Sequence, residues 1–439
     1  MQNSKFAARL LEELPALESG KIVTPEVAEA LRRHYAPHAA PGQARPVALV
    51  ISALLGGLLI GAGIILLAAH NWDELGRPAR TVLSLAPLAA GIALAFFAQA
   101  RRPGSAAWRE GGGVFYFLAI GASIALISQT YHLYNDFLGF LLVWTTLSLA
   151  LVYLLGSGAV FFGFLACVVW RGFEVADFMT GRAPGILQAW LWLLAALPFY
   201  GWHVWKRREA VMTSWLSLAI ALAVPLLLLA TAFGNEPVFS YLWPVAFASV
   251  FALFYLFSRV WFGEVPLFRN PFRALGSLGV AVLAVVLSFK YVFNHVFGGL
   301  HESHVLVAGV IFAVLAVCLV MFGPAARRRA GACNWAAAAF PLAVVLATAM
   351  ADGGAAAVVM NLYALALGGF TLARGVRRGS MAGMNEGALL LAVLAACRFF
   401  DSDISFVVRS VAFIVIGAGF LGANLWFLSR RKNKQKGPA

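Results

Sequence analysis

Apolar runs long enough to cross a lipid bilayer recur along almost the whole chain. A transmembrane helix needs about 20 mostly apolar residues, and the 439-residue chain contains twelve good runs of this kind. They span residues 47–69, 81–98, 111–128, 137–155, 186–205, 211–233, 238–257, 274–292, 305–322, 332–350, 355–373 and 404–428. Two weaker runs, 156–170 and 381–400, are short or carry polar residues near one end. Counting both, the sequence predicts an all-α, polytopic transmembrane helical bundle of about 14 helices.

The composition excludes a water-soluble or disordered chain. Hydrophobic residues make up 62% of the sequence and charged residues only 12%, whereas soluble domains average about 25% charged residues. The four cysteines lie within or at the ends of apolar runs and form no C-x-x-C pair. We therefore expect no disulfide framework and no thiolate metal site.

The basic residues predict the orientation of the helices. Each span reverses the side of the loop that follows, and cytoplasmic loops of membrane proteins are enriched in Lys and Arg. With the N-terminus inside and all 14 runs crossing, 26 of the 33 Lys and Arg residues fall on the cytoplasmic side and 7 outside. The net charge of +14 then reflects topology and attraction to anionic membrane lipids rather than nucleic-acid binding. Both termini are expected in the cytoplasm.

Residues 1–46 form the one polar segment long enough to fold in water. Apolar residues at helical spacing predict a helix over Ser4–Glu18, and Thr24-Pro25 is typical of the start of a second helix that reaches about Tyr35. This cytoplasmic helical arm could dock a partner protein or sense a ligand, or it could pack against its own bundle. The expected domains are the arm (1–46), the transmembrane bundle (47–429) and a basic cytoplasmic tail (430–439).

Polar side chains gather at the predicted outer ends of the helices. An ionisable group near lipid is a candidate functional residue. The candidate members of an outward-facing polar cavity are His70, Asn71, Asp73, Gln129, His132, Arg398 and Asp401. Such a cavity would take a small polar substrate or a lipid head group. The alternative interpretation is an interfacial aromatic belt around Trp72 and Tyr131, whose polar neighbours cap helix ends and meet water. If the cavity exists, His70 and Gln129 should lie at the same depth and meet.

Other chemistry finds little support in the sequence. His301, Glu302 and His304 lie close together but lack a recognised zinc motif. Polar residues inside the spans are few and carry no visible proton relay; they are Gln188, Asn334, Asn361 and Asn424. The sequence gives no catalytic residue, no metal site and no cofactor, and it does not indicate an oligomeric state.

The first span carries a pattern that resembles a known family. The glycine-rich run Gly56–Gly63 leads into Ala69-His70-Asn71-Trp72-Asp73, which is similar to a family of bacterial polytopic membrane proteins catalogued as domain of unknown function twenty-one fifty-seven. Other similar segments are residues 17–22, 128–131 with Trp144, and 398–401. The resemblance would cover the first third to half of the chain. It implies residence in the bacterial inner membrane and a many-helix architecture, but no reaction.

Three classes of function remain open. A transporter or flippase-like protein suits a bundle with short loops, because transporters bury their sites between helices. A non-catalytic scaffold or sensor would engage a partner through the arm. A membrane enzyme acting on lipid-linked sugars at the outer face is the weakest of the three, since the loop after Asp73 is too short to shape a sugar pocket. We expect membrane lipids as partners in every case.

Overall fold

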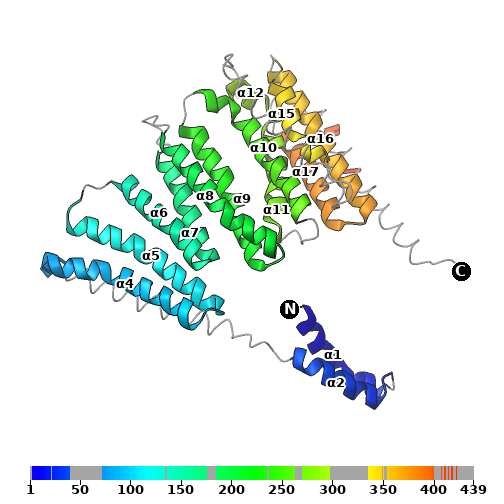
Figure 1. Ribbon diagram of the computed structural model, residues 1–439. Helices are drawn as coiled ribbons and strands as arrows, with labels where there is room; N and C mark the ends of the chain where they lie inside the picture. Colours follow the sequence, from blue (N-terminus) through cyan, green and yellow to red (C-terminus); the bar gives the residue numbers. More distant parts are fainter. Residues whose placement is uncertain are drawn as a thin grey trace. The chain divides into compact units, whose positions relative to one another are not determined.

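The computed structural model describes residues 2–20, 22–39, 72–133, 136–175, 184–234, 237–262, 269–296, 335–348, 350 and 353–399, and seven single positions between 407 and 422. Every regular element in these residues is a helix (Figure 1). The predicted all-α class is therefore confirmed. The chain divides into two compact units, residues 1–80 and 81–439. The predicted spans 47–69 and 305–322 and almost all of 404–428 lie outside the described residues.

The first unit contains the helical hairpin that the sequence predicts. Helix α1 (Gln2–Ser19) and helix α2 (Pro25–Ala39) pack together and completely bury Leu14 and Ala28 between them. Pro25 is the first residue of α2, where its missing N–H costs no hydrogen bond. The carbonyl of Thr24 accepts the first helical hydrogen bond, from the Ala28 amide at 2.9 Å. A short 3-10 helix, η1 (Trp72–Glu74), follows later in this unit.

The second unit is a bundle of helices. The longer helices are α4 (Arg77–Arg101, beginning just before the unit boundary), α5 (Ala106–Thr130), α6 (Phe137–Leu155), α7 (Gly158–Val175), α8 (Pro184–Arg207), α9 (Val211–Gly234), α10 (Pro237–Trp261), α11 (Pro271–Val286), α16 (Gly353–Arg378) and α17 (Met381–Phe399). Eight of the described helices are long and apolar enough to cross a membrane, namely α4, α5, α6, α7, α9, α10, α16 and α17. The two weak runs thus become the full helices α7 and α17. Helix α8 matches the predicted span 186–205 in extent, although it is not among the eight.

Two predicted spans are interrupted in the structure. The run 274–292 divides into α11 and α12 (Lys290–Val296), and the run 332–350 divides into α14 (Trp335–Ala338) and α15 (Phe340–Thr348). At the first break, the carbonyl of Ser288 has left the helical ladder and accepts a hydrogen bond from the Asn361 side chain of α16 at 2.9 Å. A break at membrane depth is tolerated only where another group replaces the lost hydrogen bond. Asn361 supplies that group.

Two hydrophobic clusters form the core and meet at α10. One cluster is built mainly from α5 to α9, and the other from α10, α11 and α14 to α17. Helix α10 contributes Phe254 to the first cluster, and Tyr255 and Leu256 to the second, while Phe262, just after its end, joins the first. Gly276 of α11 makes the close crossing with α10 possible, because a Cβ atom there would lie 2.7 Å from the Tyr255 amide nitrogen.

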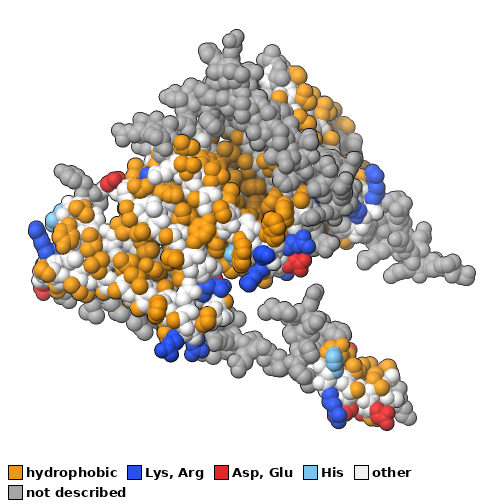
Figure 2. All heavy atoms as spheres, viewed as in Figure 1, with side chains coloured by type: hydrophobic (Ala, Val, Ile, Leu, Met, Phe, Trp, Pro, Cys, Tyr) orange, Lys and Arg blue, Asp and Glu red, His pale blue; other side chains and the backbone are white. Residues whose placement is uncertain are grey.

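The arginine-rich helix ends and turns lie at one end of the bundle, here called the basic end: residues 101–109, 206–210, 259–262, 269–273 and 374–381. Figure 2 shows Lys and Arg side chains of the bundle gathered along its lower right edge, below a surface covered by hydrophobic side chains. A hydrogen bond from the Arg269 guanidinium to the Glu209 carbonyl joins two of these segments. The orientation that the charge count predicts stays a prediction.

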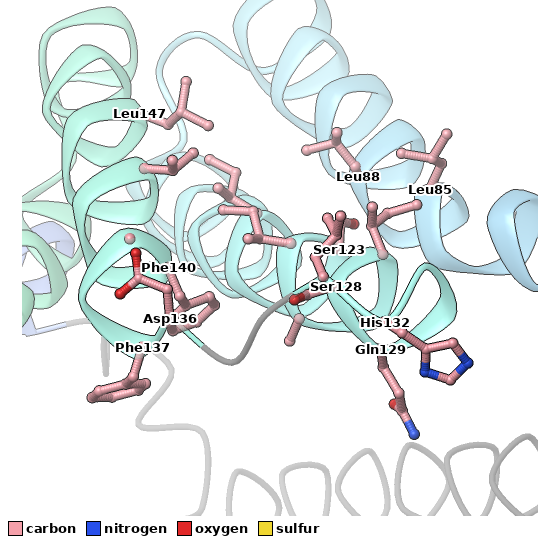
Figure 3. Close-up of a pocket in the computed structure, with 17 residues that line it drawn as sticks. Leu85, Leu88, Ser123, Ser128, Gln129, His132, Asp136, Phe137, Phe140 and Leu147 are labelled. Atoms are coloured by element: carbon pink, nitrogen blue, oxygen red, sulfur yellow. The ribbon is translucent and has the colours of Figure 1, made fainter.

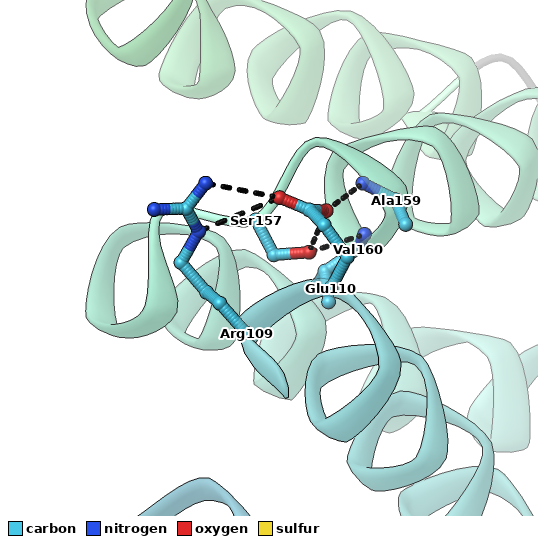
Figure 4. A network of polar contacts seen from close by, with 5 residues as sticks. All are labelled: Arg109, Glu110, Ser157, Ala159 and Val160. Carbon is cyan, nitrogen blue, oxygen red and sulfur yellow. Dashed lines mark hydrogen bonds and ion pairs between the residues drawn. The ribbon is translucent and has the colours of Figure 1, made fainter. Parts of the chain in front are cut away.

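A carboxylate fixes α5 to α7 at the basic end (Figure 4). One oxygen of Glu110 accepts hydrogen bonds from the Ser157 hydroxyl at 2.6 Å and the Ala159 amide at 2.9 Å, while the other faces Arg109 at 3.4 Å. The Ser157 hydroxyl also accepts from the Val160 amide at 3.3 Å. Glu110 and Ser157 thus cap the N-terminus of α7, where amides lack helical partners and negative charge is favoured.

Candidate functional site

A groove runs along α4, α5 and α6 at the end of these helices opposite the basic end. Its volume is about 1020 Å³, and all of its lining residues lie between residues 85 and 147. Figure 3 shows Leu85 and Leu88 of α4 facing Ser123 and Ser128 of α5, with Phe137 and Phe140 on the α6 side. The walls are mostly apolar. Polar side chains collect where α5 ends and α6 begins.

Three polar side chains form the rim of the groove: Gln129, His132 and Asp136. All three are exposed, and none of them hydrogen-bonds to another side chain of the described chain. Asp136 occupies the N-cap position of α6, yet its carboxylate makes no capping hydrogen bond. Within the described part of the chain, these three groups keep hydrogen-bonding capacity for water or a ligand. We call them the rim.

His132 has an unusual backbone. Its φ of +49° places it in the left-handed region, and it is the one non-glycine residue with positive φ among the described residues. Left-handed geometry is disfavoured for a residue with a Cβ atom. It lets the chain turn sharply after α5, which ends at Thr130, and the imidazole lies beside the Gln129 side chain at this end of the helix (Figure 3).

The floor of the groove is held by contacts between α5 and α6. The Trp144 indole donates to the Phe117 carbonyl at 2.9 Å, and its ring lies against Gly121, where a Cβ atom would come within 2.7 Å. Ser123 faces the groove and is only 3% exposed, and its hydroxyl has no hydrogen-bond partner among the described residues. An unsatisfied buried hydroxyl costs free energy unless a ligand or water meets it.

The structure brings together part of the predicted cavity. Gln129 and His132 lie side by side on the rim. His70, Asn71, Asp401 and the side chain of Asp73 lie outside the described residues. The predicted meeting of His70 with Gln129 therefore stays a prediction.

Arg398 has a different environment and does not line the groove. Its guanidinium donates to the Ser288 hydroxyl at 3.1 Å and lies 4.2 Å from the centre of the Phe289 ring. Ser288 is completely buried, and its carbonyl is the one that Asn361 satisfies. We call Arg398, Ser288, Phe289 and Asn361 the break cluster, because it surrounds the interruption between α11 and α12.

Sequence reasoning missed two residues near the groove. Asp136 belongs to the same polar run as His132, so its position next to the predicted site residues was the available signal. Arg171 was counted as a loop residue because the predicted span ended at residue 170. In the structure it is 8% exposed on α7, donates to Gln188 at 3.0 Å and to the Leu138 carbonyl, and lies 5.5 Å from the Trp192 ring centre.

Arg171 connects the start of α6 to α7 and α8. Within the described chain it forms no ion pair with a carboxylate, although Asp136 acts on it electrostatically. Its partners are a carbonyl, an amide and an aromatic face, and its Nε atom is buried without a partner among the described residues.

The described residues contain no group of three or more side chains suited to hold a metal ion. His301, Glu302 and His304 lie outside them.

Comparison with known proteins gives one match. The sequence model of a family described as a predicted membrane protein (DUF2157) matches residues 15–161, about a third of the chain. No curated protein and no solved structure matches the sequence of this chain. The matched segment contains every residue that lines the groove. The protein is therefore a membrane protein with several apolar helices, and over its first third it is similar to a predicted membrane domain of unknown function.

Proposed function

We propose that the protein binds an amphiphilic, lipid-like molecule in the groove between α4, α5 and α6, as a transporter or flippase-type protein. The observation that carries this proposal is the division of one groove into apolar walls and a polar rim. Leu85, Leu88, Val143 and Leu147 would meet acyl chains, while Gln129, His132 and Asp136 would meet a head group.

The size of the groove supports an amphiphile rather than a small ion. Pockets for drug-sized ligands measure about 300–1,000 Å³, and the groove reaches about 1020 Å³. That volume accommodates a head group together with part of an acyl chain. The unsatisfied hydroxyl of Ser123 lies deeper in the groove and offers a further hydrogen bond.

The rim favours particular head groups. Asp136 accepts hydrogen bonds, the Gln129 amide both donates and accepts, and the His132 imidazole does either according to its tautomer. Hydroxyl-rich or amine-bearing head groups meet these requirements, because they supply donors to the carboxylate. A head group whose only charge is negative would be repelled by Asp136.

Photo-crosslinking in nanodiscs tests the proposal. The full-length chain is reconstituted with a diazirine-labelled phosphatidylethanolamine, and the crosslinked residues are mapped by mass spectrometry. We expect crosslinks at the groove wall, and their loss in Ala125→Trp, because Ala125 is exposed and lines the groove. The matched control is Ala122→Trp, three residues away on the same helix, which is exposed but does not line the groove. Equal labelling of the two variants would overturn the proposal.

A second candidate function is that of a sensor or scaffold that binds a partner through the arm. The hairpin of α1 and α2 buries its own small core yet leaves Ile22 73% exposed and Val27 51% exposed. Exposed apolar groups on a small polar hairpin are suited to contact another protein. Deleting residues 1–40 separates the two functions: the groove proposal expects crosslinking to persist in the inserted bundle, whereas loss of crosslinking would make the arm part of the binding unit.

A further inference from the structure

A second pocket lies at the basic end, where α10, α11, α16 and α17 meet. It has a volume of about 90 Å³, and its charged lining residues are Arg259, Arg273, Arg374, Arg378 and Glu386. Four guanidinium groups therefore face one carboxylate. All five residues lie beyond the segment matched by the family, and the pocket shares no residue with the groove.

The close packing of two helical hairpins brings these arginines together. A Cβ atom at Gly375 of α16 would lie 2.4 Å from the Met384 amide nitrogen of α17, so the two backbones touch beside the pocket. Gly276 allows the equally close crossing of α10 and α11 described above. The arginines thus project from backbones that cannot move apart without breaking these contacts.

Two of these arginines, Arg259 and Arg273, form no ion pair with a carboxylate among the described residues. The Nε atom of Arg259 is buried and has no hydrogen-bond partner among the described residues. The guanidinium of Arg273 makes no hydrogen bond or ion pair within the described chain. Arg259 and Arg374 repel it, and Tyr255 and Glu386 attract it. One neutral hydroxyl, that of Tyr255, accepts a hydrogen bond from Arg259 at 3.3 Å and also bonds Arg374. Like charges held this close are costly where water is scarce.

Topology alone does not explain this cluster. Arginines that only orient a membrane helix can extend into water, as Arg102 and Arg208 do at the same end of the bundle. Arg259, Arg273 and Arg374 are instead half-buried and surround a common pocket. Ser380 and Gly383, at the start of α17, also line it, so that a helix N-terminus adds to the positive potential.

We propose that this pocket binds a phosphoryl group. Planar guanidinium groups bind phosphate oxygens in pairs, and the pocket volume is about that of three water molecules at ~30 Å³ each, which suits one tetrahedral oxyanion. The phosphoryl group belongs either to an anionic phospholipid of the adjacent leaflet or to free phosphate. Arg259 and Arg273 bind it directly. Glu386 weakens its binding.

Calorimetric titration of the full-length chain in a neutral detergent tests the proposal. The probes are inorganic phosphate, dioctanoyl phosphatidylglycerol, and dioctanoylglycerol, which lacks the phosphoryl group. We expect one phosphoryl probe bound per chain and no binding of dioctanoylglycerol. Arg259→Ala and Arg273→Ala should each weaken binding by about tenfold or more, as expected for a lost charge-assisted hydrogen bond. Arg102→Ala and Arg208→Ala remove the same charge outside the pocket and should leave the affinity unchanged.

The outcomes distinguish the source of the phosphoryl group. Tighter binding of dioctanoyl phosphatidylglycerol than of phosphate identifies a lipid head group, and the reverse order identifies free phosphate. Glu386→Gln should strengthen binding several-fold, a gain that a purely structural cluster would not produce, and this variant keeps the test valid if an arginine variant fails to fold. The proposal is overturned if neither phosphoryl probe binds, or if Arg102→Ala weakens binding as much as Arg273→Ala does.

Discussion

The rim of the groove and the break cluster are both polar, and both lie at helix ends remote from the arginine-rich loops. They differ in how their hydrogen bonds are satisfied. Gln129, His132 and Asp136 are exposed and bond to no side chain of the described chain. Arg398, by contrast, bonds Ser288 and stacks on Phe289. The sequence suggests one role for the two sets. The structure places them in two different environments.

This difference in hydrogen bonding distinguishes polar groups that can bind a ligand from polar groups that stabilise the fold. A polar group whose partners lie within the protein lowers the free energy of the folded state and has little left to offer a ligand. A polar group without partners contributes little to folding but can exchange water for a ligand at small cost. Arg398 therefore stabilises the interruption between α11 and α12, whereas the rim is available to bind.

The largest expected effect is in a test of membrane topology, because the comparison depends on which side of the membrane each loop lies. Reporter fusions give an all-or-none signal for the side of the membrane. They should be cytoplasmic at one set of loops and periplasmic at the other, because the Lys and Arg residues divide 26 to 7 between the two sets. The cytoplasmic sites are after Arg102, Lys206, Arg329 and Lys436, and the periplasmic sites are after Asp136 and Asp352. A periplasmic signal after Arg329 would mean that one of the preceding spans fails to cross.

Removal of the Arg398 side chain should cause the largest loss of stability. Arg398→Ala removes a hydrogen bond from a charged donor, worth about 1.5–3 kcal/mol, and a cation–π contact worth about 0.5–2 kcal/mol. We expect the free energy of unfolding to fall by about 2–4 kcal/mol, measured from the unfolding midpoint in detergent. The control is Arg377→Ala on exposed Arg377 at the end of α16. If Arg398→Ala leaves stability unchanged but abolishes lipid crosslinking, the break cluster is a binding site and the distinction fails.

Loss of the Glu110 carboxylate should have a smaller effect. In Glu110→Gln the amide can still accept one hydrogen bond, but the negative charge at the N-terminus of α7 disappears. The expected loss is about 1–2 kcal/mol, in line with the cost of removing a helix cap. Glu174→Gln, at the opposite end of α7, is a matched control because the one hydrogen bond of Glu174 within the described residues comes from the indole of Trp170 at 3.0 Å. Both variants should keep lipid crosslinking in the groove, since neither residue lines it.

The positions of most helices can be predicted from the sequence, because the hydrophobicity of each run determines them. The run 137–155 coincides with α6, and even the weak run 381–400 becomes α17 at almost the same bounds. The interruptions at Ser288 and Ala339 could not be predicted. They depend on partners distant in sequence, such as Asn361, 73 positions from Ser288.

The site could be predicted only in part, for a similar reason. Gln129 and His132 were found because polar residues at the end of an apolar run are conspicuous. Arg398 shares that local pattern, and only its contact with Ser288, 110 positions away, reveals its structural role. The pocket of arginines at the basic end was hidden because each of its members is also explained by membrane topology. Spacing along the chain does not show which arginines face one another.

The smallest effect, and the one of opposite sign, is expected at His132. Its φ of +49° costs a residue with a Cβ atom about 1–2 kcal/mol, and glycine removes that cost while adding about 0.5–1 kcal/mol of chain entropy to the unfolded state. His132→Gly should therefore raise the free energy of unfolding by about 0.5–1 kcal/mol, measured as for Arg398→Ala. The reverse test uses Gly156, whose φ is +60° at the end of α6 with nothing near enough to hinder a Cβ atom. Gly156→Ala should destabilise the protein by a similar amount.

If His132→Gly instead destabilises the protein, the imidazole has a partner inside the fold, and the rim would resemble the break cluster after all. If His132→Gly stabilises the protein while weakening head-group crosslinking, the strained backbone at His132 is retained for binding, as strain at functional sites usually is.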